Sequence, residues 1–392
     1  MPYHALTLTR AAAATLAQGR RDLALDIVPE AERCEAGQPV RLMSPEGEVV
    51  ALALVDRDNA LVRVLGLEGE GYMAPDLRLF RDRVQRAISL RRALGLAREH
   101  TPHRLIHGAG DGLPGWALDV YGDYAVLYAY SRALFVLGRA LAGVVLEELG
   151  VRGVVLKLRA REASAGAPKQ EIIGEEPPER VIIEEAGLSF EVHLGAALNV
   201  GFFSDMREHR ARLRQLAPER SVLNLFSYTG SLSVAAARAG ARSVTSVDLS
   251  AGVQRWARAN FELNRLPLEP HRFETGEVTA FLKKAARAGE TFELIIVDPP
   301  THSAARAGAW SMRKDYPDLI VRTCELLPRG GLLWLSANSR ELPSLPDLAR
   351  GAFERAKRSA QLLNVGGLPP DYPTLPAQPE DRYLQVSLFC VW

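Results

Sequence analysis

The chain has 392 residues, of which 47% are hydrophobic and 24% are charged, and its formal net charge is +1. This composition is typical of globular proteins and excludes a disordered, collagenous or coiled-coil chain, and the length indicates two or three domains. No run of about 18 apolar residues occurs and the first residues make a poor secretory signal, so we expect a cytoplasmic protein without a membrane segment. The three cysteines are widely separated, so we expect neither a disulfide framework nor a metal site.

The first part of the chain predicts β-strands at residues 40–43, 49–55 and 61–65, which would close into a small β-barrel. After a linker rich in glycine, an arginine-rich helical pattern runs from residue 77 to residue 96. The pattern that follows is strand, strand, helix, strand, strand, which indicates a small α+β domain. We predict a loop at residues 164–179, because this stretch has few apolar residues.

Seven arginines lie between Arg81 and Arg104, against only two acidic residues. Such a local excess of positive charge would attract a polyanion such as RNA. The alternative is an ordinary solvated helix face. The residues that we expect to form an RNA-binding face are Arg83, Arg86, Arg91 and Arg92.

After Gly201 the pattern changes to alternating strands and helices, which predicts a parallel, doubly wound sheet. The predicted strands lie at residues 222–226, 243–248, 292–298 and 331–336. The predicted helices lie at residues 231–239, 251–264, 277–286 and 319–327.

The clearest chemical motif is the stretch 222–250, VLNLFSYTGSLSVAAARAGARSVTSVDLS. A buried strand is followed by a loop with Gly230, and the next strand ends at Asp248, where an acidic side chain can bind ribose hydroxyls. The loop has one glycine rather than a dinucleotide fingerprint. It therefore favours a ligand with a ribose but no pyrophosphate, such as S-adenosylmethionine, over a dinucleotide. The alternative is an ordinary βαβ unit.

A second motif is the hydrophobic strand that delivers Asp298, Pro299 and Pro300 to the ligand-binding edge of the sheet. The two prolines stiffen the turn and remove two N–H donors, which leaves carbonyl groups to face a base. We predict a loop over this site at residues 304–312.

Over nearly its whole length the chain resembles the PUA-domain class I methyltransferases that act on 23S ribosomal RNA. The resemblance rests on NVGFFSDMREHR, FSYTGSLSVAAA, VDLS, ANFELN, DPPTHS and PEDRYLQ, which occur in the family's order, and on the segments 36–66 and 111–130. It implies an α/β fold with three domains. These are a PUA-like RNA-binding β-barrel at residues 1–70, a central α+β domain at residues 71–198, and a Rossmann-like methyltransferase domain at residues 199–392.

The resemblance also implies which residues bind S-adenosylmethionine. Phe226, Ser227, Tyr228, Thr229 and Gly230 would surround its methionine part, with Asp205 and Arg207 near its amino-acid end. Asp248 would bind the ribose, followed by Leu249 and Ser250, and Glu277 or Val278 would lie beside the adenine. Asp298, Pro299, Pro300, Thr301 and Asn338 would form the catalytic region, with Asp298 also bordering the cofactor.

The chain departs from the cytosine-C5 members of this family at one place. Those members carry a catalytic cysteine after the strand that follows Asp-Pro-Pro, where this chain has Ser336-Ala-Asn-Ser-Arg340. Cytosine C5 is a poor nucleophile unless a thiolate adds to C6, and we regard neither serine as a substitute. The segments DPPTHS and SANSRE instead resemble the guanine-N7 half of the bifunctional 23S rRNA methyltransferases.

The sequence thus predicts methylation of 23S rRNA, with guanine N7 as the favoured target. The alternatives are cytosine C5, a small-molecule methyltransferase and a non-catalytic RNA-binding relative. The oligomeric state is left open, with a homodimer as one alternative.

Overall fold

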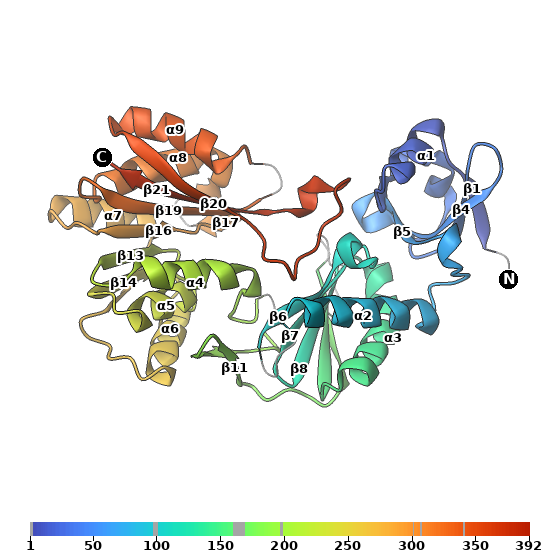
Figure 1. Ribbon diagram of the computed structural model, residues 1–392, viewed down its shortest axis with the longest axis horizontal. Coiled ribbons are helices and arrows are strands. Elements are labelled where there is room, and N and C mark those ends of the chain that lie inside the picture. The colour runs from blue at the N-terminus through green and yellow to red at the C-terminus, as the bar shows by residue number, and fades with distance from the viewer. Residues whose placement is uncertain are drawn as a thin grey trace. The chain divides into compact units, whose positions relative to one another are not determined.

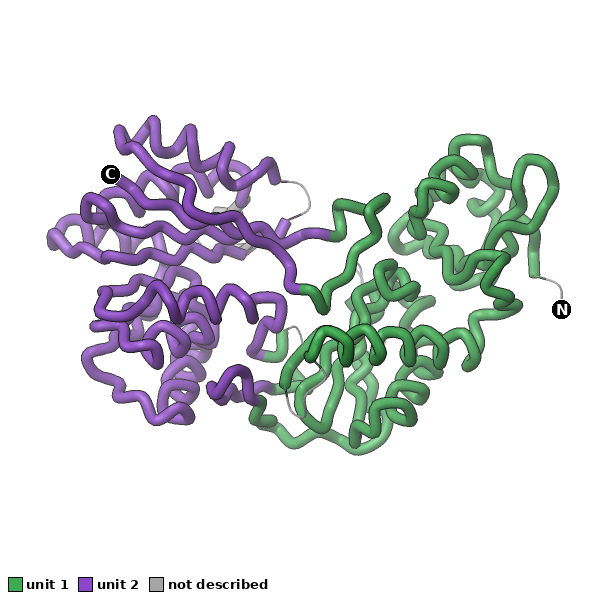
Figure 2. The backbone as a smooth tube through the Cα atoms, viewed as in Figure 1, with its two compact units in different colours: residues 1–183, 193–200, 370–381 green, residues 184–192, 201–369, 382–392 purple. Residues whose placement is uncertain are grey.

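The computed structural model describes residues 3–96, 101–159, 169–196, 199–300, 302–305, 308–339 and 342–392. The chain divides into two compact units, which Figure 2 colours separately. Unit 1 contains residues 1–183, 193–200 and 370–381, and unit 2 contains residues 184–192, 201–369 and 382–392. The backbone therefore passes between the units several times.

The N-terminal part of unit 1 is a five-stranded sheet with the strand order β1-β3-β4-β5-β2. Its elements are β1 (His4–Thr7), α1 (Arg10–Ala17), β2 (Asp22–Ala24), β3 (Pro39–Met43), β4 (Val49–Asp56) and β5 (Leu61–Leu67). The three predicted strands of this region correspond to β3, β4 and β5, which pair in antiparallel fashion. The alternation of apolar residues in these strands and in β1 supplies a core that includes Leu6, Val40 and Val62, all fully buried.

A second five-stranded sheet, in the order β10-β9-β8-β7-β6, forms the central part of unit 1. Its elements are α2 (Leu77–Ala93), β6 (His103–His107), β7 (Trp116–Tyr121), β8 (Tyr124–Ala129), α3 (Arg132–Leu149), β9 (Gly153–Leu158) and β10 (Gln170–Gly174). Ser131 caps α3 by accepting a hydrogen bond from Leu134 N–H, and Gly150 ends the helix in the left-handed conformation. The loop predicted at residues 164–179 is wrong at residues 170–174, where β10 pairs with β9, and right at residues 175–179, whereas residues 164–168 lie outside the described residues.

Residues 370–381, which we call the strap, belong to unit 1 although they lie between two strands of unit 2 in the sequence. Asp371 is fully buried: its carboxylate accepts from Arg104 N–H at 3.0 Å and its carbonyl from Arg91 at 2.8 Å. The strap also passes very close to Gly110, where a Cβ atom would lie 1.8 Å from the Pro373 carbonyl oxygen. Only glycine fits this approach.

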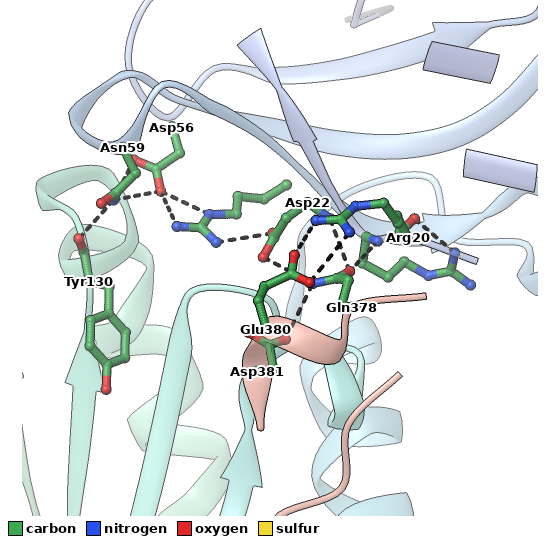
Figure 3. Close-up of polar contacts among 10 residues, drawn as sticks. Arg20, Asp22, Asp56, Asn59, Tyr130, Gln378, Glu380 and Asp381 are labelled. Carbon is green, nitrogen blue, oxygen red and sulfur yellow. Dashed lines mark hydrogen bonds and ion pairs between the residues drawn. The ribbon is translucent and has the colours of Figure 1, made fainter. Parts of the chain in front are cut away.

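The far end of the strap binds the N-terminal sheet through polar groups, which Figure 3 shows. The side-chain carbonyl of the buried Gln378 accepts from Arg21 N–H at 2.5 Å, and Arg20 pairs with Glu380. The same region holds Arg63 between Asp22 and Asp56, at 3.0 and 2.9 Å. The strap therefore contacts both sheets of unit 1.

Unit 2 is built on a seven-stranded sheet with the order β15-β14-β13-β16-β19-β21-β20. The strands are β13 (Ser221–Leu225), β14 (Ser243–Asp248), β15 (Arg272–Thr275), β16 (Leu294–Val297), β19 (Gly331–Asn338), β20 (Ala360–Gly366) and β21 (Leu384–Val391). The first five are parallel, and β21 runs antiparallel to β19 and β20. The prediction of a Rossmann-like α/β sheet is confirmed.

Helices cover both faces of this sheet, as expected for a doubly wound fold. The helices are α4 (Arg207–Leu216), α5 (Ser231–Arg238), α6 (Ala251–Leu263), α7 (Val278–Arg287), α8 (Met312–Cys324) and α9 (Leu345–Ala356). Figure 1 shows α7, α8 and α9 on one face and α4, α5 and α6 on the other. The core between the sheet and helices α7, α8 and α9 includes Val297, Tyr316 and Leu335.

Two small hairpins complete the described chain. One pairs β11 (Val181–Glu185) with β12 (Leu188–Val192), and the other pairs β17 (His302–Ala305) with β18 (Gly308–Ser311). The second hairpin replaces most of the loop predicted at residues 304–312.

Candidate functional site

The register of the sheet brings the ends of four strands into one row. Leu225, the last residue of β13, pairs with Val247 on one side and with Val297 on the other, and Val297 pairs with Leu335. The residues that come next along these strands are Phe226, Asp248, Asp298 and Ser336. They therefore lie along the carboxyl edge of the sheet, at the switch point between β13 and β16 where ligands bind in open α/β sheets.

The loop after β13 has an unusual backbone. Phe226, Tyr228 and Gly230 all have positive φ, at 59°, 48° and 78°. Left-handed φ costs energy in a residue with a Cβ atom and is retained mainly where surrounding contacts or function require it. The contacts here are the hydrogen bond from Ser227 N–H to the Val247 carbonyl, at 3.0 Å, and that from Thr229 Oγ1 to the Gly201 carbonyl, at 2.6 Å.

Asp248 lies at the centre of this loop arrangement. Its Oδ2 accepts from Tyr228 N–H and its Oδ1 from Ser250 N–H, each at 3.0 Å. Two backbone N–H groups therefore orient the carboxylate of Asp248, which is a partly exposed residue, and the following Leu249 is 60% exposed. Ser250 caps α6 by accepting from Val253 N–H.

The two residues predicted beside the adenine face different environments. Glu277 is exposed at the start of α7 and accepts from the Thr279 hydroxyl at 2.5 Å. Val278 is only 4% exposed and packs into the core of unit 2. An adenine at this place would therefore meet the Glu277 side chain and the backbone of Val278.

Sequence reasoning missed Gln254, which contacts the loop after β13. This fully buried side chain donates at 3.1 Å to the carbonyls of Ser246 in β14 and Glu274 in β15, and lies 3.4 Å from the Ser227 hydroxyl. It thus links two strands and the loop. Asn224 forms a similar buried contact, donating to the Ser233 hydroxyl at 2.9 Å.

Asp298 is held by the neighbouring strand. Ser336 Oγ donates to Asp298 Oδ1 at 2.6 Å. Burial raises the pKa of the Asp298 carboxyl, and the Ser336 hydrogen bond offsets part of this rise. Tyr316 lies close by and donates to the carbonyls of Val297 and Ser336, at 3.1 and 2.8 Å. Burial, and then the charge of Asp298, raise the pKa of Tyr316 well above its ordinary value, so its phenol remains a neutral donor.

The two prolines that follow Asp298 differ in exposure. Pro299 is buried and Pro300 is exposed, whereas Thr301 lies outside the described residues. Asn338 is the exposed last residue of β19, where it pairs with Leu384 of β21. Asp298 therefore follows β16, and Asn338 ends the neighbouring parallel strand β19.

The segment before α4 brings two further predicted residues to the loop. Asp205 is 7% exposed and accepts from the Tyr383 hydroxyl at 3.0 Å, and Arg207 is half-buried at the start of α4. The hydrogen bond from Thr229 Oγ1 to the Gly201 carbonyl links this segment to the loop after β13. Phe203 exposes 41% of its surface and its ring lies 5.4 Å from that of Tyr228, a contact that sequence reasoning missed.

Two of the four arginines predicted to face RNA do not do so. Arg83 is 7% exposed and forms two hydrogen bonds of 2.8 Å with Glu70. Arg91 is fully buried and pairs with Asp111 at 2.5 Å. Both lie on the core-facing side of α2, where a helical period of 3.6 brings every third or fourth residue. The exposed arginines of this helix are Arg78, Arg86 and Arg92.

None of the three cysteines lies at the end of β19. Cys34 and Cys324 are buried, and burial raises the pKa of the Cys324 thiol to about 11. Cys390 pairs with Leu332, near the opposite end of β19 from Asn338.

Within the described ranges no group of three His, Cys, Asp or Glu side chains could hold a metal ion. In the same ranges no helix has the length and apolar character needed to cross a membrane.

Comparison with known proteins gives results in keeping with this geometry. Residues 125–383 match the family model for S-adenosylmethionine-dependent methyltransferases. Ribosomal RNA large subunit methyltransferase I from Tolumonas auensis is 30% identical over 358 residues, which are 90% of this chain and 90% of the relative. The protein of the same name from Klebsiella pneumoniae is 30% identical over 366 residues, covering 90% and 89%. The solved structure of SMU.776, described as a methyltransferase in complex with SAH, has a TM-score of 0.87 at 27% identity and covers 99% of this chain and 100% of its own.

Proposed function

Because the chain belongs to the family of S-adenosylmethionine-dependent methyltransferases, we propose that it methylates a base of 23S ribosomal RNA, with N7 of a guanine as the target atom. The RNA substrate is supported by relatives that are named as ribosomal RNA large subunit methyltransferases and match nine tenths of the chain. The choice of base rests on the residues at the ends of β16 and β19.

S-adenosylmethionine is the cofactor. The residues described above fit it, since the oriented carboxylate of the partly exposed Asp248 can accept hydrogen bonds from two ribose hydroxyls. Glu277 would bind the adenine side, and the loop 226–230 with Asp205 and Arg207 would bind the methionine part. When bound, the cofactor supplies a methyl group on a positively charged sulfur, which any well-placed lone pair can attack.

One observation carries the assignment to guanine N7, namely that the strand end beside Asp298 presents Ser336 and Asn338 and no thiol. Guanine N7 has a lone pair and carries no proton. Its methylation forms one N–C bond, breaks one S–C bond and leaves a positive charge on the purine, so neither a base nor a covalent nucleophile is required. Orientation of the guanine is then the main task of the protein.

Asp298 and Asn338 would orient that guanine. The ionised Asp298 carboxylate can accept from guanine N–H groups, and the Asn338 amide can donate to O6. The Ser336 hydroxyl keeps the carboxylate in one position. Because hydrogen bonds to a charged acceptor are stronger than neutral ones, Asp298 should contribute more than Asn338.

RNA binding outside the site belongs to unit 1 in this proposal. We assign residues 1–70 as a PUA-like RNA-binding domain and residues 71–198 as a central domain, followed by the methyltransferase domain 199–392. Arg78, Arg86 and Arg92 of α2 would contact phosphates. A homodimer remains a prediction, which light scattering in solution would test.

The second candidate is methylation of cytosine C5, which would require a cysteine from outside the site to reach the base. The deciding experiment is nucleoside mass spectrometry of 23S rRNA incubated with the protein and methyl-labelled cofactor. Label in 7-methylguanosine is expected. Label in 5-methylcytidine would contradict the assignment, and no label in any ribosomal RNA would favour a non-catalytic RNA-binding protein.

A further inference from the structure

A hydrogen bond links two residues that are 178 positions apart in the sequence. Asp205 lies in a short 3₁₀ turn, Ser204–Met206, immediately before α4, and its carboxylate is almost completely buried. Tyr383 lies just before β21, and its hydroxyl donates to Asp205 Oδ2 at 3.0 Å. Sequence reasoning gave Tyr383 no role.

The backbone of Tyr383 is fixed by the sheet. Its carbonyl accepts from Ser339 N–H at 2.9 Å, and the next residue, Leu384, pairs with Asn338. Tyr383 is therefore held against the end of β19, the strand end that carries Asn338. Its hydroxyl reaches from there to the segment that contains Asp205.

The path of the chain brings Tyr383 to this point. The chain leaves the sheet after β20, where His209 binds the Gly367 carbonyl at 2.8 Å, then forms the strap in unit 1 and returns to unit 2 at residue 382. Tyr383 is thus the second residue after the return. The hydrogen bonds with Asp205 and Ser339 help to fix where the returning chain meets the end of β19.

We propose that Tyr383 is a positioning residue that holds the Asp205 carboxylate in the orientation that receives the positively charged amino group of the cofactor. This inference rests on the proposed placement of Asp205 at the amino-acid end of S-adenosylmethionine. A phenol suits this task because it is a neutral donor: it orients the carboxylate without cancelling its charge. A carboxylate that is oriented in this way can accept a charge-assisted hydrogen bond from an ammonium group.

The test is the affinity of the full-length chain for S-adenosylmethionine, measured by titration calorimetry. The variant Tyr383→Phe removes only the hydroxyl group. We expect its dissociation constant to rise roughly tenfold, the usual effect of losing a hydrogen bond to a charged group. The matched control is Tyr72→Phe, which removes a 3.1 Å hydrogen bond to Asp82 in unit 1 and should leave cofactor affinity unchanged.

Two further variants separate this inference from the proposal on which it rests. Asp205→Asn should weaken cofactor binding, and the double variant Tyr383→Phe/Asp205→Asn should bind no more weakly than Asp205→Asn alone. If Asp205→Asn binds the cofactor normally, the placement of Asp205 is wrong. If Asp205→Asn is weakened but Tyr383→Phe is not, or if the two losses add, the positioning role is wrong. Should Asp205→Asn be unfolded at the assay temperature, the comparison of Tyr383→Phe with Tyr72→Phe decides alone.

Discussion

Ser336 and Asp298 form a hydrogen bond of 2.6 Å between the ends of two neighbouring parallel strands. A serine in this position does two things for the carboxylate. It fixes the orientation of Oδ1, and it lowers a pKa that burial raises. The strand end that lacks a thiol therefore still contributes to the site, through its hydroxyl group.

Removal of this hydroxyl should change the pH dependence of turnover. In Ser336→Ala the pKa of Asp298 should rise further, because only burial then acts on it. The orienting role needs the ionised carboxylate, so activity should fall as the pH falls. In Ser336→Ala this fall should begin at a higher pH than in the parent protein. The measurement is kcat/KM against pH with an rRNA fragment. Ser387→Ala is the matched control, since Ser387 is buried in β21 and its hydroxyl has no hydrogen-bond partner among the described residues. An acid limb at the same pH in both variants would contradict the role of Ser336.

Asp248→Ala should abolish detectable cofactor binding. The variant loses the acceptor for the ribose and also the anchor for Tyr228 N–H and Ser250 N–H, so we expect a loss of at least about 100-fold in affinity. Calorimetry with S-adenosylhomocysteine measures this loss. Asp347→Ala, at an exposed aspartate of α9, serves as the control. Normal affinity in Asp248→Ala would mean that the cofactor binds elsewhere.

The arginines of α2 should separate into two groups with different phenotypes. Replacing the exposed Arg78, Arg86 and Arg92 by Gln should weaken RNA binding and reduce the slope of log affinity against log salt by about 2 to 3. Cofactor affinity and thermal stability should not change. Binding of the RNA fragment at several salt concentrations measures the slope.

Replacing Arg91 by Gln is the contrasting variant. It leaves Asp111 buried without its charged partner, so we expect a loss of about 3–5 kcal/mol of stability. Denaturant unfolding measures this loss. If the exposed triple variant keeps its salt slope, α2 is an ordinary solvated helix and RNA binds through another surface.

A chain without cysteine should remain active. Guanine N7 needs no thiolate, so the variant with Cys34, Cys324 and Cys390 replaced by Ala should methylate RNA, with some loss of stability from the buried Cys34 and Cys324. The parent protein should form no covalent complex with RNA that contains 5-fluorocytidine. Its product should be cleaved by borohydride and aniline, which act on the charged 7-methylguanine ring. Loss of turnover in a folded cysteine-free variant would exclude the N7 chemistry.

Much of unit 2 could be predicted from the sequence because its signals are local. Apolar strands with turn residues at their ends predicted β13, β14, β16 and β19 to within a few residues. The loop of Gly230 and the carboxylate of Asp248 follow from the same local pattern. In contrast, β15, β20 and β21 were not predicted. β15 has only four residues, two of them charged, β20 has no alternation of apolar and polar residues, and β21 lies beyond the alternating strands and helices.

The missed parts of the site depend on partners that are distant in the sequence. Nothing near Gln254 shows that its amide will join β14 and β15, and nothing near Tyr383 indicates Asp205. The arginines of α2 illustrate the same limit. Their number suggested RNA binding. In the folded chain, however, Arg83 is buried and pairs with Glu70, and Arg91 is buried and pairs with Asp111, so neither lies on the surface.

The strap also sets the order in which the protein can finish folding during its synthesis. Asp371 supplies acceptors for Arg91 and Arg104, and Gln378 binds Arg21 at a separation of 357 residues. Unit 1 therefore cannot complete its polar core when its own sheets leave the ribosome. Arg91 can pair with Asp111 early, but the contacts of Arg91, Arg104 and Arg21 with the strap form only when nearly the whole chain has been made. A chain truncated before residue 370 would lose buried contacts at its opposite end. Truncations or substitutions in the strap, close to the C-terminus, would thus destabilise the sheets of unit 1, which are synthesised first.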